Sequence, residues 1–224
     1  MGSMKKIDLE HAIDALREEI QHGVFIPGQR LVESDLMVHL GITRGKVREV
    51  FRHLQTEGLI KIEKNRGAIV RKITRVELSQ ITEVLEDISV LMLRKIGKRT
   101  DESNTQKKLK KLLKETQRFR LKSTEIFSVQ DYMEENARFW GALAELSENP
   151  VLSEIRERLQ SQLFRFAMEG LIVSRDKDKW ITLHEDIVSS LLKRDVGHAV
   201  RFARKSMSDV WEAIASLPDR AFAK

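Results

Sequence analysis

The alternation of apolar and polar positions divides the chain into two parts. In the first part, apolar residues recur every three to four positions in three stretches, and two short β-prone runs follow. Gly41 and Gly58 stand where two of the helical stretches should end, and Asn65 and Gly67 suit a turn between the β-prone runs. We therefore predict helices over 7–21, 32–41 and 42–58, and a hairpin over 59–62 and 68–70.

The second part has no strand pattern after residue 74. Apolar stripes at helical spacing continue to the end of the chain and are interrupted by short polar breaks. They predict helices over 78–96, 106–121, 125–147, 151–171, 177–194 and 196–217. The expected fold class is mostly α. We place a three-helix domain with a β-hairpin over 5–73 and an all-helical, antiparallel bundle over 76–219.

One window of the first domain carries a dense excess of positive charge. The whole chain carries a formal net charge of +6, but residues 41–73 hold nine Lys and Arg against three Asp and Glu. A dense basic window on a small domain is the electrostatic footprint of a nucleic-acid binder. The alternative is an ordinary solvated, charged helix face. The sequence order of two helices, a turn and a basic hairpin favours nucleic acid.

Composition excludes several other classes. The chain contains no cysteine, which rules out disulfides and thiolate metal sites and fits a reducing compartment. No apolar run has the length needed to cross a bilayer. We see no nucleophile–base pair, metal cluster or phosphate loop, so we expect neither an enzyme nor a cofactor. We expect a cytoplasmic protein, associated with the nucleoid, that does not bind membranes.

The motif that carries a function is the turn "LGITR" between the second and third helices. Two helices joined by a short turn that contains glycine are typical of a helix-turn-helix, whose second helix enters the major groove of DNA. On a helical wheel Arg48, Arg52 and Gly45 face away from the apolar side, and Arg44 and Lys46 flank that outward face. Arginine suits the guanine edge, and a glycine there allows close approach of the backbone.

Two neighbouring features extend this surface. Thr43 and the open N–H groups of the first helical turn can hold a phosphate oxygen. The predicted hairpin tip is basic and forms a wing able to reach the DNA backbone or the minor groove; it contains Lys64, Asn65, Arg66 and Gly67. "GITRGK" superficially suggests a nucleotide-binding loop. Its glycine spacing is one residue short and Val47 replaces the required hydroxyl, so we set that reading aside.

The ordered pieces "PGQRLVESDL", "LGITR", "VRE", "LQTEGLI" and "NRGA" resemble the winged helix-turn-helix domain of the GntR family of bacterial transcription regulators. The resemblance implies DNA contacts at Ser34, Thr43, Arg44, Gly45, Lys46, Arg48, Lys64, Asn65 and Arg66. Lys46 stands where the family often has proline, so this helix start gains a charge and loses a preset φ.

The helical remainder resembles the FadR-like (FCD) branch, whose bundle surrounds an effector pocket. The resemblance implies a homodimer that binds a palindromic operator in double-stranded DNA, most simply as a repressor, and responds to a small organic metabolite. Many relatives hold a metal there with one aspartate and three histidines. The matching positions here are Asn136, Trp140, His184 and Ser206, which leave a single histidine, so we expect no metal.

Two interpretations of those four residues stay open. They can form a metal-free effector pocket that offers an amide, an indole face, an imidazole and a hydroxyl. Alternatively, Trp140 fills the space and His184 is a core histidine, so that the bundle serves only as a dimerisation scaffold without an effector. The sequence does not choose between them.

Overall fold

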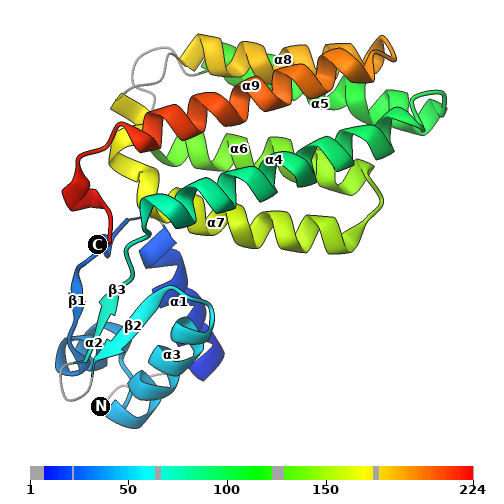
Figure 1. The fold of residues 1–224 in the computed structure, drawn as a ribbon. Helices are drawn as coiled ribbons and strands as arrows, with labels where there is room; N and C mark the ends of the chain where they lie inside the picture. Colours follow the sequence, from blue (N-terminus) through cyan, green and yellow to red (C-terminus); the bar gives the residue numbers. More distant parts are fainter. Residues whose placement is uncertain (1–7, 22, 64–66, 123–128, 174–176, 224) are drawn as a thin grey trace. The chain divides into compact units, whose positions relative to one another are not determined.

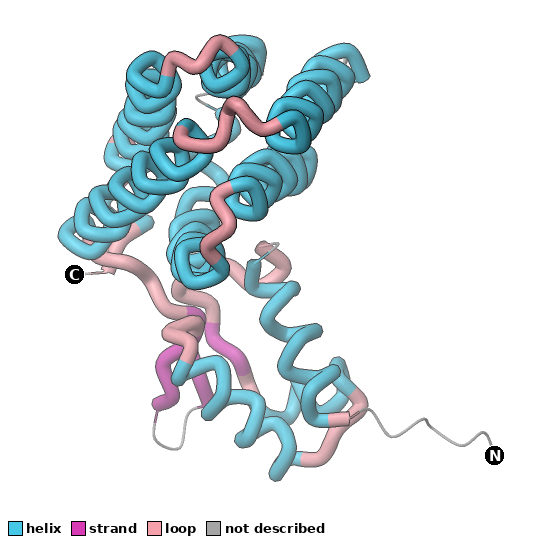
Figure 2. The backbone as a smooth tube through the Cα atoms, turned by 90° about the vertical axis from the view of Figure 1, so that its right-hand side faces the viewer, coloured by secondary structure: helices cyan, strands magenta, loops and turns pink. Residues whose placement is uncertain are grey.

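The computed structural model describes residues 8–21, 23–63, 67–122, 129–173 and 177–223. The chain folds as two compact units. Unit 1 comprises Met1–Thr74 with Asp219–Lys224, and unit 2 comprises Arg75–Pro218. The predicted fold class, mostly α with a winged helix-turn-helix before a helical bundle, is confirmed. Among the described residues, strands occur in unit 1 alone (Figure 2).

Unit 1 is built from the predicted helices and hairpin together with a short extra strand. Its elements are α1 (Leu9–Gln21), β1 (Arg30–Leu31), α2 (Glu33–Leu40), α3 (Arg44–Thr56), β2 (Ile60–Glu63) and β3 (Gly67–Val70). The sheet has the order β1-β3-β2 with antiparallel pairs, and α3 packs on α1, α2 and β2 (Figure 1). Strand β1 was not predicted, because two residues are too few to show alternation.

Gly41 and Gly58 act as the predicted helix ends. Gly41 closes α2 in the left-handed region at φ 64°, and its N–H bonds to the carbonyl of Met37. Gly58 follows α3 at φ 72°. Both conformations are those that glycine adopts without the steric cost of a side chain. Gly41 therefore marks the end of α2, and Gly58 lies just beyond the end of α3.

The core of unit 1 comes from the apolar stripes of its helices and from the inner face of its sheet. Leu16, Leu36, Leu54 and Val70 represent these elements and are each at most 2% exposed. The last residues of the chain also join this unit. The N–H of Ala223 donates to the carbonyl oxygen of Ile73 at 2.8 Å. The sequence-based partition assigned residue 219 to the helical domain, whereas Asp219 begins a 3-10 turn (η1, Asp219–Ala221) that groups with unit 1.

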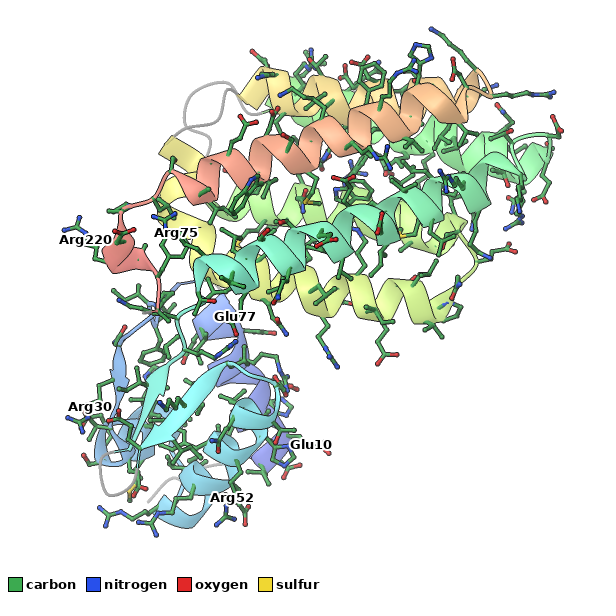
Figure 3. The ribbon with its side chains drawn as sticks, viewed as in Figure 1. Glu10, Arg30, Arg52, Arg75, Glu77 and Arg220 are labelled. Carbon is green, nitrogen blue, oxygen red and sulfur yellow. The ribbon has the colours of Figure 1, made fainter. Side chains whose placement is uncertain are left out.

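Unit 2 consists of long helices joined by short connections. They are α4 (Arg75–Gly97), α5 (Ser103–Lys122), α6 (Val129–Leu146), α7 (Pro150–Val173), α8 (Lys177–Leu192) and α9 (Val196–Ala215). Helix α9 packs on α8 and α4, α5 on α8, and α7 on α4 and α6. Leu93, Phe139, Val188 and Ala199 lie in the shared core. Arg75, labelled in Figure 3, donates to the carbonyls at the C-terminal end of α9 and ties that end to the start of α4.

Candidate nucleic-acid interface and buried polar site

Helix α3, the second helix of the predicted helix-turn-helix, is amphipathic as predicted. Val47, Val50, Phe51 and Leu54 are each at most 2% exposed and form the face turned toward the core of unit 1. The opposite side is exposed and carries the cationic residues of the basic window. The packing of four apolar side chains therefore determines which residues α3 presents to a partner.

The C-terminal end of α3 is held by an ion pair with α1. The guanidinium of Arg17 donates to both carboxylate oxygens of Glu57, at 2.6 and 2.9 Å. This bidentate pair is half-buried, and its hydrogen bonds raise the pKa of Arg17. The pair fixes the helix axis at the end far from the turn, so the N-terminal end of α3 is presented in a defined orientation.

Thr43 is the N-cap residue of α3, as predicted, but its side chain makes no capping hydrogen bond. The first helical N–H groups of an α-helix have no intrahelical acceptor, and here the cap hydroxyl does not take one of them. Thr43 is exposed. A phosphate oxygen placed here would meet N–H donors, a hydroxyl and the positive end of the helix dipole.

Arg44 and Arg48 share one acid, Glu33 at the start of α2. The Nε atom of Arg48 donates to Glu33 Oε1 at 2.8 Å, and the Nε atom of Arg44 lies 3.4 Å from Glu33 Oε2. The hydrogen bond from Arg48 lowers the pKa of Glu33 and raises that of Arg48. Both arginine side chains remain more than half exposed. Glu33 thus orients two exposed guanidinium groups on one side of the helix turn.

Glu33 was missed by sequence reasoning. Its partners lie on another helix, and one of them is 15 residues away. Hydrophobic periodicity detects neighbours within one helix, so it gives no sign of a pair on two different helices.

Gly45 lies between these arginines on the exposed face of α3. A Cβ atom added to Gly45 would have no atom within 4 Å, so nothing inside the protein requires a glycine there. Gly67 is different. It adopts φ 81°, and a Cβ there would collide with the carbonyl oxygen of Leu31 in β1. The close approach of β1 and β3 therefore explains the glycine at position 67 without any contact to DNA.

A groove runs along this side of unit 1. It is lined by α2, α3 and the strands, through Arg30, Val32, Glu33, Ser34, Arg44, Arg48, Phe51, Arg52, Ile62, Glu63 and Gly67. Arg30 and Arg52 project from β1 and α3 in Figure 3. Ser34 is exposed and donates to Asp35, while Lys46 is partly buried. The predicted wing residues Lys64, Asn65 and Arg66 lie outside the described residues.

The four residues predicted for an effector pocket are all buried in unit 2. Asn136 is 5% exposed, Trp140 4%, His184 0% and Ser206 6%. They come from α6, α8 and α9. The rings of Trp140 and His184 meet edge to face with centroids 6.3 Å apart. The structure thus brings Trp140 and His184 together within the helical core.

Aromatic rings surround the buried imidazole of His184. Phe139 stacks on it with centroids 3.7 Å apart, and Trp180 approaches it at 4.6 Å. No group of three or more His, Cys, Asp or Glu side chains that could hold a metal occurs among the described residues. The expectation that the site binds no metal stays a prediction.

Sequence reasoning also missed the buried arginine Arg156 on α7. It is 4% exposed, and its guanidinium carbon lies 4.1 Å from the ring centroid of Trp140. The spacing of Leu152, Arg156 and Leu163 places the arginine on an apolar helix face. That spacing was the signal that could have revealed it. Trp140 therefore contacts a buried cation, Arg156, on one side and the imidazole of His184 on another.

Comparison with known proteins gives a consistent result for both units. Residues 9–70 match bacterial regulatory proteins of the gntR family, and residues 77–209 match the FCD domain. The chain is 24% identical over 202 residues to the HTH-type transcriptional repressor RspR of Escherichia coli, covering 90% of this chain and 86% of that protein. It is 25% identical over 218 residues to the Uxu operon regulator of Haemophilus influenzae, covering 92% and 79%.

A solved structure supports the fold. A putative GntR transcriptional regulator from Rhodococcus sp. RHA1 superposes with a TM-score of 0.74 at 20% identity, over 94% of this chain and 98% of that one. In addition, no helix among the described residues has the length and apolar character needed to cross a membrane.

Proposed function

The chain belongs to the GntR family of bacterial regulatory proteins and carries an FCD domain, and from that premise we propose that it is a homodimeric repressor of transcription controlled by a small metabolite. A DNA-binding transcription regulator, rather than an enzyme, is what the family assignment establishes. The palindromic operator, the dimer, the effector and the sign of regulation are our proposal. We place its action in the cytoplasm, where bacterial operators are found.

The observation that carries the DNA-binding mechanism is the arginine pair on Glu33. Arg44 and Arg48 stand exposed at the N-terminal end of α3, and one carboxylate orients both. In a helix-turn-helix this end of the second helix meets base edges in the major groove. Ser34, Thr43, Lys46 and Arg52 then contact phosphates or bases beside it, with the wing on the DNA backbone. Two-fold symmetry of a dimer requires an approximately palindromic operator.

Exposed apolar side chains on unit 2 support a dimer. Val84 and Leu91 of α4 are 46% and 45% exposed and lie seven residues apart, on one face of their helix. Val151 and Ile155 of α7 are 62% and 42% exposed. Helices α4 and α7 pack against each other. Exposed apolar groups gathered on neighbouring helices are typical of a protein interface.

The buried site of unit 2 supports effector control rather than a scaffold alone. A site that binds a small molecule combines an apolar wall with a few polar groups. Trp140 supplies apolar surface beside the imidazole of His184, and Asn136 lies one helical turn before Trp140 on α6. Ser206 is buried on α9. Effector binding can change the operator affinity only by as much as the effector's own affinity differs between the two arrangements of the dimer.

Footprinting on the regulator's own upstream DNA tests the proposal. We expect protection of two half-sites about one helical turn apart or a multiple of it. Arg44→Ala should weaken operator binding by about 1–3 kcal/mol for each base that the arginine reads. Arg94→Ala, which removes an exposed arginine from α4, is the matched control and should leave the footprint intact. Equal footprints for the wild type and Arg44→Ala would contradict the assigned role.

A further inference from the structure

Helix α5 of unit 2 carries a dense positive charge. Its 20 residues, Ser103–Lys122, include eight Lys and Arg and one Glu, which gives the helix a net charge of +7. The whole chain has a formal net charge of +6, so all residues outside α5 together carry a net charge of −1. The helix-turn-helix unit therefore does not account for the basic character of this protein, and α5 needs an explanation of its own.

The cations of α5 lie on the side of the helix that faces away from the bundle. Residues at intervals of three, four and seven share one face of a helix. Five exposed cations have this spacing: Lys107, Lys110, Lys111, Lys114 and Arg118. On the opposite side Leu109, Leu112 and Thr116 are buried, where α5 packs on α8 and α6 (Figure 1). The five cations, which we call the α5 stripe, extend over about 16 Å of the helix axis.

Acidic side chains beside α5 form their closest ion pairs with cations outside the stripe. These pairs are Glu145 with Lys108, Glu185 with Arg120, and Glu115 with Arg138. Among the residues that the structure describes, Lys111 is the one member of the stripe within 4 Å of an acid, at 3.7 Å from Glu115. The other four members have no ion pair in this part of the chain. The stripe therefore presents positive charge that the protein itself leaves largely uncompensated.

The fold of the bundle does not explain the stripe. The apolar side of α5 makes the contacts with α8 and α6, whereas the stripe is exposed. Like charges three or four residues apart on a helix repel each other, and Lys110 and Lys114 are such a pair. Keeping these cations together therefore opposes the stability of α5. A partner outside the chain that carries negative charge would offset this repulsion.

The length and charge of the stripe fit an extended polyanion. One strand of duplex DNA carries a phosphate at about every 3.4 Å of the helix axis, so a row of 16 Å spans several phosphates. A second copy of α5 does not fit, because two stripes would repel each other. An anionic membrane does not fit either. Helices that lie on a membrane insert an apolar face, and the apolar face of α5 is buried in the bundle.

Duplex DNA is also the polyanion that the family assignment brings to this protein. We propose that the α5 stripe binds phosphates of duplex DNA and forms a second contact surface, which does not read sequence. Four of its five members are lysines, whose compact charge suits phosphate but lacks the planar fork that reads a guanine edge. Because α5 belongs to the same chain as a DNA-binding unit, it meets duplex at a raised effective concentration, so weak contacts are sufficient.

The binding of full-length variants to two duplexes of equal length tests the inference. One duplex contains the footprinted operator and the other a scrambled sequence. Lys107→Gln/Lys110→Gln/Lys114→Gln should weaken binding to both by the same factor, roughly tenfold or more at about 50 mM salt. The slope of log K against log salt should become shallower by about 0.9 for each phosphate contact that is lost. The Tm of this variant should not fall, because repulsion within α5 is reduced.

The matched control removes the same charge from another helix of unit 2. Arg201→Gln/Arg204→Gln/Lys205→Gln changes three exposed cations of α9. Two of them already have acidic partners: Arg204 pairs with Glu86, and Lys205 with Asp209. This variant should retain the affinity of the wild type for both duplexes and the same salt slope.

Several results would overturn the inference: unchanged DNA binding by the α5 variant, an equal loss in the α9 control, or a loss confined to the operator. Binding to phosphatidylglycerol vesicles that depends on the stripe, with DNA binding unaltered, would assign the stripe to a membrane instead. Arg44→Ala separates this surface from the helix-turn-helix. If Arg44→Ala leaves the preference for operator intact while the α5 variant loses affinity for both duplexes, the base-reading role fails and the stripe stands.

Discussion

Replacing Gly45 with alanine should stabilise the protein and weaken its binding to DNA. Gly45 lies near the start of α3, is exposed, and would place an added Cβ where no atom lies within 4 Å. Alanine at a helical position of this kind is favoured over glycine by about 0.5–1 kcal/mol. For a chain of this length, a gain of that size raises Tm by roughly 1–4 °C.

The effect on DNA has the opposite sign. If the α3 backbone approaches the major groove closely between Arg44 and Arg48, the new methyl group meets DNA. Forcing a methyl group into a packed contact costs about 1–3 kcal/mol, or roughly 5- to 150-fold in affinity. Fluorescence anisotropy with a labelled operator and differential scanning calorimetry measure the two effects on the same sample.

Gly141 provides a matched control for Gly45→Ala. It lies inside α6 of unit 2, is exposed, and also has no atom within 4 Å of an added Cβ. Gly141→Ala should raise Tm by a similar amount and leave operator affinity unchanged. Unaltered operator binding by Gly45→Ala would refute the close approach of the backbone. A fall in Tm would refute the reasoning about open space at Gly45.

Three further changes test separate parts of the structure. Glu33→Gln should raise non-specific DNA affinity and reduce the preference for operator, measured against Glu18→Gln, which removes an exposed charge from α1. Because the folded pKa of Glu33 is lowered, its stabilising effect should be full above its ordinary pKa of 4.5 and disappear as pH falls through the lowered value. Leu91→Glu should dissociate the dimer in sedimentation velocity, whereas Leu121→Glu, at an exposed position of α5, should not. Gly67→Ala should lower Tm, because the left-handed φ and the clash with β1 both oppose a side chain.

Much of unit 1 could be predicted from sequence because its signals are local. The four buried residues of α3 repeat at helical spacing, and Gly41 and Gly58 mark helix ends through the backbone conformation they permit. The helical wheel also predicted that Arg44, Arg48 and Arg52, which line the groove, lie on or beside the outward face of α3. The pairing of Glu33 with two arginines could not be predicted, since it depends on how α2 and α3 cross.

The helices of unit 2 could be predicted from the sequence, but the arrangement of the buried side chains between them could not. Asn136, Trp140, His184 and Ser206 were identified through the family resemblance, and all four are buried. Their mutual geometry depends on packing between helices that lie far apart in sequence. Arg156 resembles an ordinary charged residue in "EIRERL". Its spacing from Leu152 and Leu163 was a local sign of an apolar helix face, and the structure shows that the side chain is buried there.

The salt dependence of operator binding tests the central claim, that the N-terminal end of α3 binds duplex DNA together with the wing. Binding that neutralises phosphates releases counterions, so log K should fall linearly with log salt, with a slope of about −0.9 for each phosphate contacted. A dimer with about six or more such contacts should lose roughly a thousandfold in affinity between about 50 and 200 mM salt. An operator affinity that stays constant over this range would contradict the account.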